Sequence, residues 1–232
     1  MKRLVLIFAA ALALAVAGVA SGKVVQLGDG DPFLPGSKCP NDPCLAAYQV
    51  TGYQDSADGK TNRFLIKRSG KVVAFTVKLG KLSPNQAQTF DQQFRAPASV
   101  RLTILRRGKK RSRRNDHRVL SQSQVFEVND YFGESPTFVL DEPLNAPLGS
   151  VVALTVPTWA PVLAGDQGRE TVWRSSRVRN RCGQGRSLAP RSTQQRLGQL
   201  ITWGCNYSGA RLLYSATYVP ANRTAAPDAN TP

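Results

Sequence analysis

The chain has 232 residues and a formal net charge of +16, from 31 Lys or Arg against 15 Asp or Glu. At this length one core can bury about 70% of the unfolded surface, so the four cysteines are not needed in place of a core. The chain has one histidine and no HExxH, GxSxG or P-loop sequence, which excludes the enzyme classes that carry those motifs.

The first twenty residues have the three parts of a secretory signal peptide. Lys2 and Arg3 are charged, Leu4 to about Val16 is apolar, and a small-x-small cleavage site ends at Ala20. We therefore expect residues 1–20 to be removed near Ala20 and the protein to be secreted. An uncleaved anchor is the alternative, but the apolar stretch is near the lower limit for a span of about 20 residues.

Short β-rich runs between turn residues dominate the rest of the chain. The first strands are expected at residues 24–27 and 46–53. Residues 63–79 are expected to form two strands that turn at Ser69-Gly70, with Val73, Phe75, Val77 and Leu79 alternating on one face of the second strand.

A single short helix is expected over residues 83–94. Ser83 is a candidate N-cap, Pro84 stands at the first helical position, and Gln86 completes a capping box. Phe90 and Phe94 are four residues apart and would share a face.

Strands then resume, at residues 99–105, 118–128, 136–140, 150–156, 170–175 and 210–219. This pattern predicts an all-β fold, an antiparallel β-sandwich of jelly-roll or immunoglobulin-like topology, with a closed barrel as the alternative. Residues 21–219 are expected to form one domain without a transmembrane segment. Residues 220–232 are expected to be a disordered tail, because they have almost no apolar bulk.

The cysteines predict two disulfides in an oxidising compartment, with three connectivities open. We favour Cys39–Cys44, which closes a tight loop, and Cys182–Cys205. A zinc site of four thiolates is the alternative, but the second pair does not repeat the spacing of the first. We expect no metal site and no cofactor.

The charge excess is localised in two segments. Residues 106–118 hold eight Lys or Arg and one acid, and residues 169–196 hold eight Arg and one acid. The rest of the exported chain is balanced. Localised cations are what an anion-binding surface requires, since contacts of Lys and Arg with phosphate or sulfate release counterions. The candidate anion-binding residues are Arg106, Arg107, Lys109, Lys110, Arg111, Arg113, Arg114, Arg118, Arg174, Arg177, Arg179 and Arg181.

The expected partner is an anionic polymer of the cell envelope, or a polysaccharide. No Trp, Tyr or Phe lies within residues 106–118, so the stacking platform for single-stranded nucleic acid is missing and no specific nucleic-acid partner is expected. The alternative is that both segments are solvated loops. Val100, Leu102 and Ile104 alternate into the first segment, which predicts that it connects the two strands of a long hairpin. The two interpretations depend on whether the segments share one face.

Few residues in the sequence are candidates for a catalytic site. His117 lies among cations that would depress its pKa, and we expect a surface histidine. Five acids near turns, Glu127, Asp130, Glu134, Asp141 and Glu142, are the candidates for the carboxylate pair of a glycan-active hydrolase. Acids at turns most often cap or solubilise, so we expect no enzyme.

Aromatic residues supply a further hypothesis, contact with carbohydrate. The candidates are Trp159, Trp173, Trp203, Tyr48, Tyr131 and Tyr207. We expect each of them to lie in the core instead, because aromatic side chains supply much of the buried area of a domain. Trp203 is expected to pack beside the disulfide of Cys205.

Four stretches, "GKVVAFTVKL", "SVRLTILRR", "APLGSVVALTVP" and "ARLLYSATYV", together with the late cysteine pair, carry a family resemblance. Over about residues 72–219 the chain resembles secreted β-sandwich proteins of unassigned function from GC-rich bacteria. The resemblance implies the fold and export, and it implies no active site or ligand. Together with the charge, it predicts a secreted, non-enzymatic sandwich that binds polyanions through Arg-rich loops, or a structural or carbohydrate-contacting sandwich whose basic loops are incidental.

Overall fold

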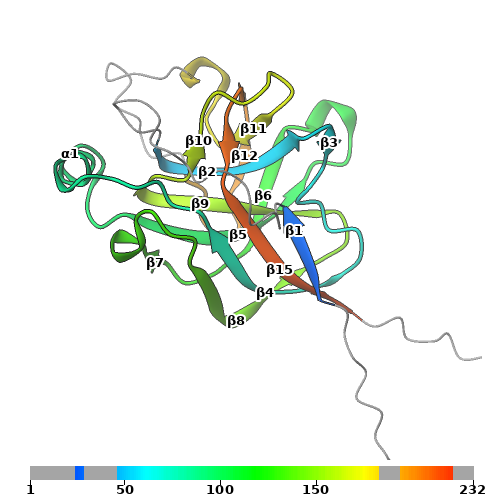
Figure 1. Cartoon of the computed structure of the whole chain (residues 1–232). Helices are drawn as coiled ribbons and strands as arrows, with labels where there is room; N and C mark the ends of the chain where they lie inside the picture. Colours follow the sequence, from blue (N-terminus) through cyan, green and yellow to red (C-terminus); the bar gives the residue numbers. More distant parts are fainter. Residues whose placement is uncertain (1–23, 29–45, 183–193, 222–232) are drawn as a thin grey trace, which may run out of the picture.

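The computed structural model describes residues 24–28, 46–182 and 194–221. The expected signal peptide, the Cys39–Cys44 pair and all but the first two residues of the expected tail lie outside these residues. The described part is an all-β sandwich of antiparallel sheets with a single α-helix (Figure 1). This confirms the predicted fold class.

Two main sheets form the layers. The four-stranded sheet has the order β1-β15-β4-β8, made by β1 (Val25–Gly28), β15 (Tyr214–Pro220), β4 (Gly70–Val77) and β8 (Thr137–Ala146). The nine-stranded sheet has the order β12-β6-β5-β9-β2-β11-β13, with β3 beside β2 and β7 beside β5. Its strands are β2 (Ala47–Ala57), β3 (Lys60–Thr61), β5 (Ser99–Arg107), β6 (Asp116–Gln122), β7 (Phe126–Glu127), β9 (Ser150–Ala160), β11 (Val172–Ser175), β12 (Leu200–Thr202) and β13 (Cys205–Ser208). A small third sheet pairs β10 (Leu163–Ala164) with β14 (Arg211–Leu212).

Apolar residues of the two main sheets form one continuous core. Phe75, Leu102 and Leu154 are at most 1% exposed. Phe64 stacks on Tyr214 with ring centroids 4.1 Å apart, and the Tyr214 hydroxyl donates to the Val152 carbonyl. Burial of such side chains is the main stabilising contribution to a domain of this size.

The large sheet curls until its two edges nearly meet. β12 is one edge strand and β13 is the other, yet only Trp203 and Gly204 separate them in the chain. The concave side of the curl is a second buried face, and it is polar. Thr155 bonds Thr51 at 2.8 Å and Thr103 at 2.7 Å across three neighbouring strands. Seven successive residues of β9 are therefore buried, because both faces of this strand are covered.

Helix α1 (Pro84–Phe94) begins and packs as predicted. Ser83 and Gln86 form the capping box, and the Phe90 and Phe94 rings lie 6.0 Å apart on one face. Phe94 stacks on Tyr48 at 4.2 Å, and Phe90 lies 4.9 Å from Trp159. The helix thus lies against the ends of β2 and β9.

The prediction of a hairpin that turns at Ser69-Gly70 is wrong. Residues 62–69 form no strand beyond a single bridge at Leu65. Phe64 and Ile66 are both buried, and their backbones bond residues 150–152 of the large sheet, so the segment crosses between the layers. The alternation in β4 also shifts: Val72 is buried and Val73 only half-buried, because the register slips between Val72 and Ala74.

Candidate anion-binding surface

The first Arg-rich segment forms a hairpin, which we call the basic hairpin (residues 106–118). Arg106 pairs with Arg118, and Arg107 pairs with His117, so these residues belong to β5 and β6 and not to the connection. The connection itself is residues 108–115, with a 3-10 turn at Arg111–Arg113. Gly108 allows the two ends of this connection to approach each other closely, since a Cβ at residue 108 would lie 2.0 Å from the Arg113 carbonyl oxygen.

Seven of the eight cations in the basic hairpin are exposed: Arg106, Lys109, Lys110, Arg111, Arg113, Arg114 and Arg118. Within the described part of the chain, no ion pair involves any of them. Arg118 donates to the Gly198 carbonyl at 2.9 Å, which leaves its charge without a counter-ion. Their positive charge is therefore directed at solvent.

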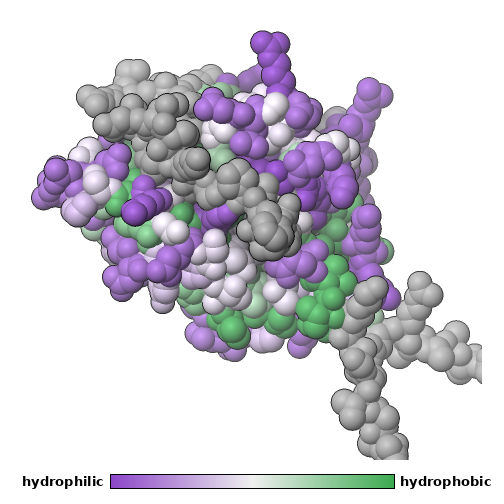
Figure 2. Space-filling model, in the orientation of Figure 1, coloured by the Kyte–Doolittle hydropathy of each residue, from purple (hydrophilic) through white to green (hydrophobic). Residues whose placement is uncertain are grey.

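The second Arg-rich segment lies beside the first. The consecutive amides of Trp203 and Gly204 donate to Asn115 and Arg177, each at 2.8 Å, and so link the two segments. Arg174 Nη2 also donates to Asn115 Oδ1 at 3.0 Å. The two segments thus meet at one end of the curled sheet. Most of the surface drawn at the upper right of Figure 2 is hydrophilic, where Figure 1 draws this end.

The arginines of the second segment differ in exposure. Arg179 and Arg181 are exposed, and Arg174 is half-buried. Arg177 is only 6% exposed; its guanidinium lies 4.6 Å from the centre of the Tyr48 ring and donates to the Tyr207 hydroxyl. Arg177 therefore packs inside the fold and is not part of the exposed surface. Residues 183–193 lie outside the described part.

His117 is buried, so the expectation of a surface histidine is wrong. It is 0% exposed and stacks on Trp203 with centroids 4.2 Å apart. Nδ1 donates to the Asn115 carbonyl at 2.8 Å, which leaves Nε2 to accept the Tyr53 hydroxyl proton at 3.2 Å. Burial, more than the cations Arg107 and Arg174, lowers the His117 pKa to about 3.

The buried pair beneath the surface is neutral near pH 7. Burial also raises the pKa of Tyr53, against the opposing effect of Arg107 and Arg174. The pair fixes the base of the basic hairpin, because the Asn115 carbonyl accepts from both His117 and the Trp203 amide. No local feature of the sequence points to Tyr53 or Asn115, since their roles depend on strands that are distant in the chain.

The Cys182–Cys205 disulfide is confirmed. It ties Cys182, near the middle of the second Arg-rich segment, to β13. Disulfides are typical of extracytoplasmic proteins. Trp203 stacks on His117 and lies tilted against Tyr53, and its Nε1 donates to Gln195 Oε1 at 2.7 Å. Trp159, Trp173 and Trp203 are at most 4% exposed and Tyr207 is 8% exposed, as expected for core residues. For Tyr131, which is 38% exposed, the expectation of a core position is wrong, and Tyr48 is only half-buried.

The five acids proposed for glycan hydrolysis are all exposed. Among the described residues, no group of three His, Cys, Asp or Glu side chains could hold a metal ion. The hydrolase stays an untested prediction.

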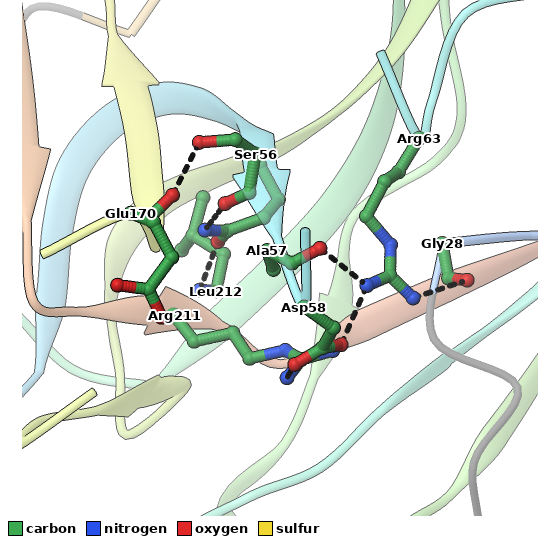
Figure 3. Close-up of polar contacts among 9 residues, drawn as sticks. Gly28, Ser56, Ala57, Asp58, Arg63, Glu170, Arg211 and Leu212 are labelled. Atoms are coloured by element: carbon green, nitrogen blue, oxygen red, sulfur yellow. Dashed lines mark hydrogen bonds and ion pairs between the residues drawn. The ribbon is translucent and has the colours of Figure 1, made fainter. Parts of the chain in front are cut away.

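One carboxylate organises a different group of arginines (Figure 3). Asp58 lies in the β2–β3 turn and accepts from Arg211 at 2.7 Å and 3.1 Å, and from Arg63 at 2.7 Å. The Arg211 side chain is 3% exposed. These hydrogen bonds, with Arg211 first, hold the pKa of Asp58 below its usual value. We call these three residues the Asp58 cluster.

Comparison with protein-family models, curated proteins and solved structures finds no match for this chain. The resemblance to secreted sandwich proteins therefore stays a prediction. Among the described helices, none has the length and apolarity to cross a membrane.

Proposed function

We propose that the protein is a secreted, non-enzymatic module that binds an anionic polymer, such as a cell-envelope polymer or polysaccharide, through its basic hairpin. The observation that carries the proposal is the set of seven exposed cations without an acidic partner among the described residues. Unneutralised cations bind polyanions through counterion release.

The geometry of the hairpin base supports this proposal. Asn115, the last residue of the connection, is held by His117, Trp203 and Arg174, so one end of the connection that carries five of the seven cations is already fixed before binding. A preorganised surface loses less conformational entropy when it binds. Arg179 and Arg181 add two exposed cations from the neighbouring segment.

The test is retention on heparin and on immobilised teichoic acid as salt is raised. Changing Arg111, Arg113 and Arg114 together to Ala should lower the salt needed for elution. It should also reduce the slope of log affinity against log salt by about 2 to 3, since each phosphate contact contributes about 0.9.

The matched control changes Lys67, Arg68 and Lys71 to Ala. These cations are also exposed, and their removal changes the net charge equally. The control should leave retention nearly unchanged. Equal shifts in both variants would mean that net charge alone causes retention, and the proposal would be lost.

A further inference from the structure

Arg106 and Arg107 are neighbours on β5 but point to opposite faces of the large sheet. Arg106 pairs with Arg118 and is exposed, whereas Arg107 pairs with His117 and is half-buried. Directly paired residues of antiparallel strands share a face, so Arg107 points with His117 into the concave side of the curl. Asn62 Oδ1 accepts from Arg107 Nη1 at 3.4 Å.

Arg174 reaches the same place from the second Arg-rich segment. It pairs with Tyr53 on β2, and its Nε lies 3.7 Å from the Asp55 carboxylate. The Asp55 carbonyl accepts from the amide of Asn62, whose side chain accepts from Arg107, so contacts through two residues join the two arginines. The charges of both arginines act on Tyr53 and His117. Two guanidinium groups, one from each Arg-rich segment, therefore converge above one neutral Tyr–His pair.

Arg174 also orients two amide side chains. Its Nη2 donates to Asn115 Oδ1 and its Nε donates to Asn206 Oδ1, both at 3.0 Å. Because each Oδ1 is the acceptor, each Nδ2 group is left as a donor. Both asparagines are exposed, and no described residue accepts from either Nδ2.

Two carboxylates, of Asp55 and Asp116, lie near the two arginines. Asp55 is the acid in contact, with its Oδ2 3.7 Å from Arg174 Nε. The nearby carboxylate of Asp116 accepts from the Thr202 hydroxyl at 2.6 Å. Asp55 is the carboxylate in contact with a guanidinium, whereas Asp116 directly precedes His117 in β6 and so faces the other side of the sheet. Two guanidinium groups and two amide donors share the concave side, an arrangement that suits an oxyanion with several acceptor oxygens.

We infer that Arg107, Arg174, Asn115 and Asn206 form a discrete site for one phosphate or sulfate group. We call these four residues the mouth site. The inference rests on the proposed function, because the natural ligand would be one phosphate or sulfate group of the bound polymer. The exposed cations of the basic hairpin would then supply affinity that depends on salt, and the mouth site would select the kind of anionic group.

The experiment titrates the intact secreted chain with inorganic sulfate and, separately, inorganic phosphate, followed by NMR of arginine and asparagine side chains. We expect saturable shifts at Arg107, Arg174 and the two Nδ2 groups. Arg107→Gln should weaken binding roughly tenfold, the usual effect of losing a charge-assisted hydrogen bond. Arg106→Gln removes the same charge from the adjacent residue and should weaken binding less than about twofold.

Two further variants keep the test independent of folding. Asn206→Ala alters an exposed side chain and should weaken binding severalfold, whereas Asp55→Asn should strengthen it by removing the adjacent carboxylate. Equal weakening by Arg106→Gln and Arg107→Gln, or shifts that never saturate in the wild type, would overturn the mouth site.

Glycerol phosphate and a sulfated monosaccharide, titrated in parallel, distinguish a phosphate source from a sulfate source. The two proposals also fail separately. The change of Arg111, Arg113 and Arg114 to Ala could leave heparin and teichoic-acid retention unchanged while Arg107→Gln still weakens sulfate binding. In that case the proposed polymer function is wrong and the mouth site remains.

Discussion

The Asp58 cluster and the basic hairpin both contain arginine side chains, but in opposite surroundings. In the Asp58 cluster a carboxylate accepts from two arginines, one of which is buried, and the ion pairs tie the β2–β3 turn to β14. In the basic hairpin seven cations face solvent, and among the described residues none of them forms an ion pair. The two regions therefore differ in whether a carboxylate lies within reach of the cations, and only the cations of the basic hairpin are available to an external anion.

The largest expected difference between the two regions is the pH at which each loses its contribution to folding stability. His117 is neutral in the folded protein because its pKa is about 3, whereas an unfolded histidine binds a proton near pH 6.5. The unfolded state is thus favoured as pH falls below 6.5, and stability is lost down to about pH 3. Between pH 7 and pH 4 this single group should cost about 3 kcal/mol. Asp58 has a lowered pKa, so its contribution is lost only at still lower pH, below its usual value of 3.8.

Urea unfolding at a series of pH values measures this effect. His117→Gln should be less stable than the wild type at pH 7 but should show a flatter dependence between pH 6.5 and 4. Identical slopes in the two proteins would show that His117 does not titrate on unfolding.

Removing the carboxylate of the Asp58 cluster should have the next largest effect. Asp58→Asn removes the charged acceptor that Arg211 and Arg63 share and should lower the free energy of unfolding by about 2 kcal/mol. Asp166→Asn is the control, because Asp166 is exposed and shares the positive φ of Asp58. A loss no greater than that of the control would mean that the ion pairs do not stabilise the fold.

The smallest effect on stability is expected at the basic hairpin. Changing Arg111, Arg113 and Arg114 together to Ala should shift the free energy of unfolding by less than about 0.5 kcal/mol, since the three side chains are exposed and unpaired. A slight increase would also fit, because the change relieves repulsion between like charges. A large loss in urea unfolding would show that the hairpin cations are structural and would remove the contrast with the Asp58 cluster.

Local signals in the sequence were sufficient for several elements. The capping box at Ser83, the alternation of Val100, Leu102 and Ile104, and the Cys182–Cys205 pair all appear in the structure as expected. Each depends on spacing along the chain or on a simple pairing rule. The Asp58-Gly59 turn carried a signal of the same kind, because both residues have positive φ and Asp-Gly is typical of tight hairpins.

The environment of single residues was less predictable. His117 appeared exposed because its neighbours in the sequence are charged, yet strand alternation turns it inward onto Trp203 and Tyr53. Arg177 appeared to be a surface cation, yet it lies against Tyr48 and Tyr207. In a strand, adjacent residues face opposite sides, so local composition does not determine the burial of any one of them.

The sequence by itself determined the fold class, the helix, the late disulfide and the concentration of charge in two segments, because these follow from periodicity, spacing and composition. The tertiary structure decided that the two segments meet. That contact requires the large sheet to curl until β12 and β13 are joined by two residues, which brings Asn115 beside Arg174. Such curvature arises from the packing of all the strands together, and no short stretch of the chain specifies it.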